Sequence, residues 1–229
     1  LRNQLEKHGV EFYMQSAVKS ISDGKVTFER KGKEQSVEAD KVLMAVGRRP
    51  VVEGYGLENT TIEHDARGIV VDDNMQTNVP GVYAIGDVNA RMMLAHAATM
   101  QGLHVVNHIL GITDNIRLDI MPAAIFTNPE AACVGKTEDQ LKAEGVEIEV
   151  RKKMYRTNGR ALAMNEAEGY IKLCVSATDG LILSCHAFGA HSADIVQEVS
   201  ALMCKNTTLH ELHEMVHIHP TLGEMLQEI

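Results

Sequence analysis

The stretch that decides the fold closes the chain, at residues 216–229, and reads V-H-I-H-P-T-L-G-E-M-L-Q-E-I. Within it His219 precedes Pro220, and the carboxylate of Glu224 follows closely enough to fix the tautomer and orientation of the imidazole. Such a pair is typical of a general base. Proline suits the first position of a helix, so we expect a short helix from Pro220 through residues 221–228. A surface histidine on an ordinary C-terminal helix is the alternative, and the rest of the chain decides between the two.

The composition describes a globular chain. Its 229 residues, 45% of them hydrophobic, suit one large or two smaller domains. A net charge of −9 argues against nucleic acid or an anionic membrane surface as the main partner. No apolar run approaches a membrane span, and the opening L-R-N-Q has neither an initiator methionine nor a signal-peptide profile. We therefore expect the chain to begin mid-protein.

Cysteine usage favours a reducing compartment, which we expect to be the cytoplasm, or the mitochondrial matrix in a eukaryote. The cysteines are too far apart for a C-x-x-C pair and too few for a secreted disulfide scaffold; they are Cys133, Cys174, Cys185 and Cys204. A two-residue type I′ turn at Asp179-Gly180 predicts that Cys174 and Cys185 lie directly opposite each other across a hairpin.

The first part of the chain predicts strands and one helix end. Leucines at helical spacing end at Gly9, as in a helix with a glycine C-cap. Alternating apolar and polar residues then predict a three-stranded antiparallel meander, over residues 10–21, 25–30 and 34–39. The continuous apolar run of residues 42–46 predicts a strand buried on both faces and closed by Gly47.

The middle part predicts two short strands, a Gly-Asp turn and a long helix. A loop over residues 51–68 leads to a short strand at 69–71, and a second buried strand is expected at 82–85. Asp87 follows Gly86 directly after that strand. It either bonds a ligand hydroxyl or N-caps the long apolar-periodic helix expected over residues 92–110, and the residues leave both open.

The last part predicts an α+β domain with an antiparallel sheet. From residue 123 onward we expect a strand, a turn, strand 131–134, helix 137–144, three strands and helix 192–204; the three strands are expected near 146–155, 169–175 and 181–188. A histidine cluster follows, made of His210, His213, His217 and His219. Although two of these histidines are four residues apart, no cysteine lies near them, and we predict no metal site.

Five segments together resemble one family, the flavin-dependent pyridine nucleotide–disulfide oxidoreductases. They follow one another in the family's order over essentially the whole chain; they are residues 40–50 (D-K-V-L-M-A-V-G-R-R-P), 77–87 (T-N-V-P-G-V-Y-A-I-G-D), 93–96 (M-L-A-H), 124–130 (A-I-F-T-N-P-E) with Val134-Gly135, and 217–224 (H-I-H-P-T-L-G-E). Leu222 after H-P-T favours the branch that oxidises dihydrolipoamide over glutathione reductase-like relatives, which tend to carry H-P-T-S-x-E.

The resemblance implies a fold of three successive domains, only partly held by this chain. Residues 1–47 would be the last half of the NAD-binding domain, 48–118 the returning segment of the FAD-binding domain, and 119–229 the interface domain that makes a homodimer. Family positions imply residue roles as well. Val18 and Gly47 would line the NAD site, Asp87 would bond the ribityl chain of FAD, His219 would be the base and Glu224 its orienting partner. Four residues would approach the flavin ring: Met93, Leu94, Ala95 and His96.

The implied activity is the oxidation of protein-bound dihydrolipoamide, with electrons passing through a redox disulfide and FAD to NAD⁺. The implied partners are the lipoyl-bearing subunits of 2-oxo acid dehydrogenase or glycine-cleavage complexes. Neither the family's G-x-G-x-x-G nor its C-x₄-C pair occurs here, so we expect both upstream and expect this chain alone to be inactive. A glutathione reductase-like enzyme, or a dimerisation module without chemistry, remains as the alternative.

Overall fold

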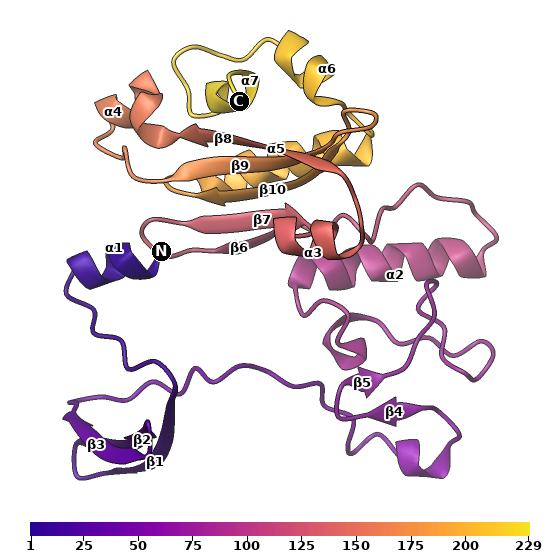
Figure 1. Ribbon diagram of the computed structural model, residues 1–229. Coiled ribbons are helices and arrows are strands. Elements are labelled where there is room, and N and C mark those ends of the chain that lie inside the picture. The colour runs from indigo at the N-terminus through magenta and orange to yellow at the C-terminus, as the bar shows by residue number, and fades with distance from the viewer. The chain divides into compact units, whose positions relative to one another are not determined.

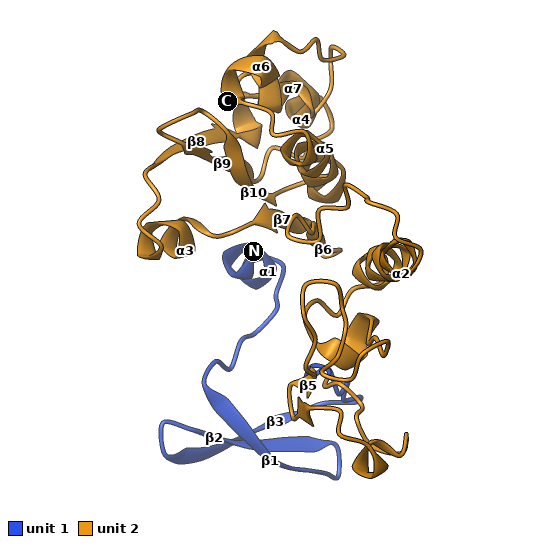
Figure 2. Cartoon of the chain, turned by 90° about the vertical axis from the view of Figure 1, so that its right-hand side faces the viewer, with its two compact units in different colours: residues 1–48 blue, residues 49–229 orange.

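The computed structural model describes residues 1–229, and the chain divides into two compact units, Leu1–Arg48 and Arg49–Ile229 (Figure 2). None of the helices combines the length and the apolar character needed to cross a membrane.

The first unit holds helix α1 (Arg2–Lys7) and a three-stranded antiparallel sheet of β1 (Ser16–Ser22), β2 (Lys25–Arg30) and β3 (Lys33–Glu38). The predicted glycine cap is confirmed, because Gly9 has φ +89° and the next N–H bonds back to the Leu5 carbonyl. The predicted meander is confirmed too. Its first strand starts only at Ser16, because Gln15 adopts a left-handed conformation (φ +55°) that interrupts the extended chain.

The strand predicted over residues 42–46 is wrong. These residues form no strand, and the side chains of Leu43 and Val46 are 88% and 86% exposed. A strand buried on both faces needs a neighbour on each side, and no strand of this chain pairs with it.

The second unit begins with short elements: η1 (Leu57–Asn59), β4 (His64–Asp65), β5 (Gly68–Ile69) and η2 (Gly86–Asn89). The strand predicted at 69–71 is thus reduced to a two-residue pairing with β4. The strand predicted at 82–85 is wrong, because Tyr83 makes only one isolated bridge, to Gln76, and Ile85 is exposed. The long helix is present as α2 (Ala95–Ile109), which starts after the predicted residue 92.

A five-stranded antiparallel sheet organises the remainder, in the order β6-β7-β10-β9-β8. Its strands are β6 (Ala123–Ile125), β7 (Ala131–Gly135), β8 (Ile148–Met154), β9 (Tyr170–Ser176) and β10 (Ile182–Phe188). Helix α5 (Ser192–Cys204) covers one face (Figure 1). The shorter helices are α3 (Glu138–Ala143), η3 (Tyr155–Thr157), α4 (Gly159–Ala163), α6 (Leu209–Glu214) and α7 (Glu224–Gln227). The predicted α+β domain with an antiparallel sheet is therefore confirmed.

The predicted cysteine pairing is wrong in its register. Cys174 lies opposite Ser184, and Cys185 lies opposite Leu173, because the β9–β10 connection is longer than two residues and the register shifts next to Ile182. All four cysteines are free thiols.

Candidate functional site

The imidazole of His219 and the carboxylate of Glu224 form a direct hydrogen bond. His219 Nδ1 lies 2.7 Å from Glu224 Oε1, and Glu224 Oε2 accepts a second bond of 2.6 Å from the Thr221 N–H. The backbone N–H of Thr221 is the largest influence lowering the pKa of Glu224, followed by the hydrogen bond from His219. An ionised carboxylate only accepts, so Nδ1 carries the hydrogen and the lone pair is left on Nε2.

The two members of this pair differ in exposure. The His219 side chain is 82% exposed, whereas that of Glu224 is 19% exposed. The structure therefore places Nε2 at the surface, while the carboxylate that holds Nδ1 is mostly buried and accepts a second hydrogen bond. This is the arrangement that a base needs if its substrate arrives from outside the chain.

The turn that carries His219 is fastened to the core. Leu222, Met225 and Leu226 are buried in the main hydrophobic cluster. Asn158, at the start of α4, donates from Nδ2 to the Thr221 carbonyl at 3.0 Å. The turn is therefore held by apolar burial on one side and by a side-chain hydrogen bond on the other.

The predicted start of the last helix at Pro220 is wrong. Helix α7 begins at Glu224 with Gly223 as its N-cap, and the His219–Pro220 peptide bond is cis. Residues 220–223 therefore form a turn before the helix, and Glu224 Oε2 accepts the Thr221 N–H within it.

The histidine cluster does not gather into one site. Residues 213–217 spell H-E-M-V-H, an H-E-x-x-H pattern that our reading of the sequence overlooked. That pattern supplies two ligands only when both histidines share one helix face, but α6 ends at Glu214 and Met215 is extended. His217 is bonded to Glu198 of α5 instead. The structure contains no group of three or more His, Cys, Asp or Glu side chains that could hold a metal ion.

Asp87 lies in the first turn of η2, and its carboxylate is exposed and free of hydrogen bonds within the chain. The N-cap alternative is wrong, because Leu94 occupies the N-cap of α2. The turn is built by a residue that sequence reasoning missed. Buried Gln101 of α2 accepts from the Gly86 N–H at 2.8 Å and from Asn89 Nδ2 at 3.0 Å. The hydrogen bonds of Gln101 thus fix the turn that places the Asp87 carboxylate at the surface.

The four residues predicted to approach a flavin sit where α2 begins. Met93 and Leu94 are partly buried, whereas Ala95 and His96 are exposed. His96 Nε2 bonds the Pro122 carbonyl at 2.8 Å, which ties this end of the helix to the segment before β6. Because η2 packs against α2, the structure brings Asp87 and these residues together on one pair of elements.

The two residues predicted for the NAD site belong to the other unit. Val18 lies on β1 with 61% of its side chain exposed, and Gly47 (φ +103°) lies in the irregular stretch after β3. They are not brought together by any secondary structure within the first unit.

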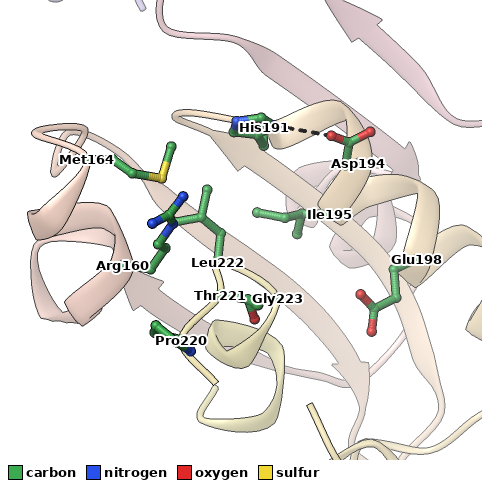
Figure 3. Close-up of a pocket in the computed structure, with 10 residues that line it drawn as sticks. All are labelled: Arg160, Met164, His191, Asp194, Ile195, Glu198, Pro220, Thr221, Leu222 and Gly223. Atoms are coloured by element: carbon green, nitrogen blue, oxygen red, sulfur yellow. Dashed lines mark hydrogen bonds and ion pairs between the residues drawn. The ribbon is translucent and has the colours of Figure 1, made fainter. Parts of the chain in front are cut away.

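A pocket of about 370 Å³ borders the turn that carries His219 (Figure 3). The turn supplies one wall and α5 supplies another, with α4 and its following residue opposite. Its lining residues are Arg160, Met164, His191, Asp194, Ile195, Glu198, Pro220, Thr221, Leu222 and Gly223.

Comparison with known proteins gives two family matches. Residues 1–102 match the pyridine nucleotide-disulphide oxidoreductase family, and residues 121–229 match the dimerisation domain of the same family.

Similar proteins carry related names. The chain is 40% identical to a dihydrolipoyl dehydrogenase of Bacillus subtilis, over 99% of this chain and 49% of the relative. It is 39% identical to the mitochondrial dihydrolipoyl dehydrogenase 1 of Arabidopsis thaliana, over 99% of this chain and 46% of the relative. The chain spans about half the length of the curated relatives it matches.

Solved structures of disulfide reductases also match this chain. The crystal structure of LpdA from Mycobacterium tuberculosis matches with a TM-score of 0.89 and 26% identity, over 99% of this chain and 50% of that one. The HOCl-induced flavoprotein disulfide reductase RclA of Escherichia coli shares the fold, with a TM-score of 0.85 and 24% identity, over 100% of this chain and 53% of that one. The predicted fold class is confirmed, and the chain belongs to the pyridine nucleotide-disulphide oxidoreductase family.

Proposed function

We propose that this chain is part of a flavoprotein that oxidises protein-bound dihydrolipoamide to lipoamide and delivers the electrons to NAD⁺. The observation that carries the proposal is the His219–Glu224 hydrogen bond, with His219 Nε2 at the surface. The similarity to dihydrolipoyl dehydrogenases over the whole chain supports the choice of substrate.

The chemistry of a dithiol requires such a base. A thiol has a pKa near 8.5, so at neutral pH it is mostly protonated, whereas the thiolate is the nucleophile in disulfide exchange. His219 Nε2 takes the proton of one substrate thiol, and that sulfur attacks the redox disulfide, whose S–S bond breaks to give a mixed disulfide and a thiolate. The second substrate sulfur then displaces the mixed disulfide, which closes the lipoamide disulfide and leaves the redox disulfide reduced to a dithiol. Glu224 stays ionised and stabilises the imidazolium that forms. Returning the proton completes the cycle of the base.

FAD, when bound, would accept the electron pair from the reduced disulfide and pass it as a hydride to NAD⁺. The residues present fit a flavin nucleotide at η2 and α2. Gly86 (φ +73°) lets the backbone turn sharply, and the free Asp87 carboxylate is an acceptor for a ligand hydroxyl. Met93, Leu94, Ala95 and His96 would lie beside the ring, and Val18 and Gly47 would contribute to the NAD site.

The domain assignment follows from these roles. Residues 1–47 would belong to the NAD-binding domain, 48–118 to the FAD-binding domain and 119–229 to the interface domain. We place the protein in the cytoplasm, or in the mitochondrial matrix in a eukaryote, where lipoyl-bearing subunits of 2-oxo acid dehydrogenase or glycine-cleavage complexes would be its partners.

We propose a homodimer formed through residues 119–229, with His219 serving the disulfide of the partner subunit. The surface beside the base suits an interface, because Val216 and Ile218 are 96% and 79% exposed.

The test is an assay of the complete protein with dihydrolipoamide and NAD⁺, beside a matched assay for glutathione disulfide reduction. Turnover with dihydrolipoamide at a rate at least a hundred times that with glutathione disulfide is expected, on the order of what a specific site achieves. Turnover with glutathione disulfide alone would move the chain to the low-molecular-weight disulfide reductases. No turnover with either substrate would favour a dimerisation module without chemistry.

A further inference from the structure

A second histidine lies two residues before the base and is held in the opposite way. The side chain of His217 is only 8% exposed. Its Nδ1 lies 3.1 Å from the Met215 carbonyl oxygen, and its Nε2 lies 2.9 Å from Glu198 Oε1. A carbonyl and a carboxylate only accept hydrogen bonds, so a ring that makes both bonds carries a proton on each nitrogen. Both ring nitrogens of His217 therefore have an acceptor within hydrogen-bond distance.

Glu198, the carboxylate partner of His217, comes from a helix that is packed into the core. It lies on α5, whose Ile195 and Val199 are buried in the core. The start of α5 is anchored as well, because the Ala193 N–H donates to Glu130 Oε2 at 3.1 Å. The His217–Glu198 pair therefore fixes the loop before the base to the helix that covers the sheet.

The turn after the base packs on the same pair. A Cβ built on Gly223 would lie 3.6 Å from His217 Cδ2 and 3.7 Å from Glu198 Oε2, which is ordinary van der Waals contact. Figure 3 shows Glu198 on α5 in the same close-up as Thr221 and Gly223 of this turn. The segments on both sides of His219 are therefore positioned against one ion pair.

The two histidines are paired with two different glutamates. His217 lies 2.9 Å from Glu198 of α5, and His219 lies 2.7 Å from Glu224 of α7. The Thr221 N–H and the hydrogen bond from His219 are the largest influences that lower the pKa of Glu224, and His217 adds the smallest. Arg160 and Asp194 line the pocket beside these pairs, and Glu214 lies 3.6 Å from His210 instead.

We infer that His217, held by Glu198 and the Met215 carbonyl, is a positioning residue that fixes the turn carrying His219 and so aligns the His219 Nδ1–H with Glu224. This inference rests on the proposed role of His219 as the base. It assigns the first histidine of H-I-H-P a separate task from the second.

The test compares His217→Gln, Glu198→Gln and the double variant in the complete protein. The matched control is His210→Gln, because His210 is also paired with a glutamate, Glu214, at 3.6 Å but lies on the exposed side of α6. Flavin reduction by dihydrolipoamide and flavin reduction by NADH are measured separately, and urea unfolding monitors stability.

For His217→Gln we expect the dithiol step to slow about tenfold, on the order of the effect of a small misplacement of a catalytic group. Flavin reduction by NADH should be unchanged. The double variant should be no slower than His217→Gln, since the two side chains act as a unit.

A loss of stability with an unchanged dithiol step, or behaviour like that of His210→Gln, would overturn the inference. Selective ¹⁵N-histidine spectra give a readout that does not depend on turnover. In the wild-type protein His219 should hold its hydrogen on Nδ1, and in His217→Gln that preference should weaken. If the spectra change as expected while His219→Gln leaves the dithiol step intact, the proposed function fails and the positioning role stands.

Discussion

Replacing Gln101 by methionine should destabilise the turn that carries Asp87. Gln101 is 4% exposed, and its Oε1 is the acceptor for the Gly86 N–H and for Asn89 Nδ2. Methionine keeps the length and burial of the side chain but accepts no comparable bond. Leaving the buried Gly86 N–H without a partner costs about 1–3 kcal/mol. Asn89 Nδ2 keeps its 2.9 Å bond to the Ala84 carbonyl, so the loss of its second bond costs only about 1 kcal/mol. The variant should therefore lower the free energy of unfolding by roughly 2–4 kcal/mol in total.

Urea unfolding of wild type and variant at one pH measures this loss. The midpoint should fall with an unchanged m-value, since the unfolded state is not altered. Gln197→Met is the matched control, because Gln197 is exposed on α5 and should change stability by less than about 0.5 kcal/mol. If Gln101→Met is as stable as Gln197→Met, the turn does not depend on this amide. In the complete protein the same variant should also release FAD more readily.

Two further predictions concern the core and the acid stability of the second unit. The side chain of Leu226 is fully buried beneath the turn that carries His219, so Leu226→Ala should lower the free energy of unfolding in urea by about 2–5 kcal/mol. Leu162 of α4 is exposed, so Leu162→Ala should change that free energy by less than about 0.5 kcal/mol, and equal effects of the two variants would contradict the assigned packing. The Asn107 amide lowers the pKa of Asp114 below its ordinary value of 3.8, with the Ile116 N–H and His104 adding to the effect. Because the unfolded chain binds this proton more readily, the contribution is present above that value and is lost as pH falls through the lower folded pKa. Asp114→Asn should therefore make the loss of stability between about pH 5 and pH 2 shallower, and an unchanged slope would count against the network.

Much of the fold could be predicted from local chemistry. The meander turns at Asp23-Gly24 and Lys31-Gly32 have positive φ at both positions, the geometry that two-residue hairpins prefer and that glycine permits. Residues 42–46 and 82–85 were predicted wrongly for a common reason. An apolar run becomes a buried strand only when other strands flank it, and the sequence of the run itself contains no information about its neighbours.

The contacts of the candidate site were likewise predictable only in part. The His219–Glu224 pair could be predicted because the two residues are close in the sequence and join across one turn. The partners of His217 and Gly86 could not, since Glu198 and Gln101 reach them from helices 19 and 15 residues away. Such bonds depend on how the helices pack. The H-E-x-x-H pattern at 213–217 is the converse case, because the helix it requires ends inside the motif.

The central claim is that His219, held by Glu224, is the proton acceptor of the dithiol reaction. Stopped-flow measurement of the two half-reactions in the complete protein tests it directly. In His219→Gln, flavin reduction by dihydrolipoamide should slow by about 10²–10⁴-fold, the usual contribution of a general base, while flavin reduction by NADH should stay near the wild-type rate. Equal slowing of both half-reactions, or of neither, would contradict the account.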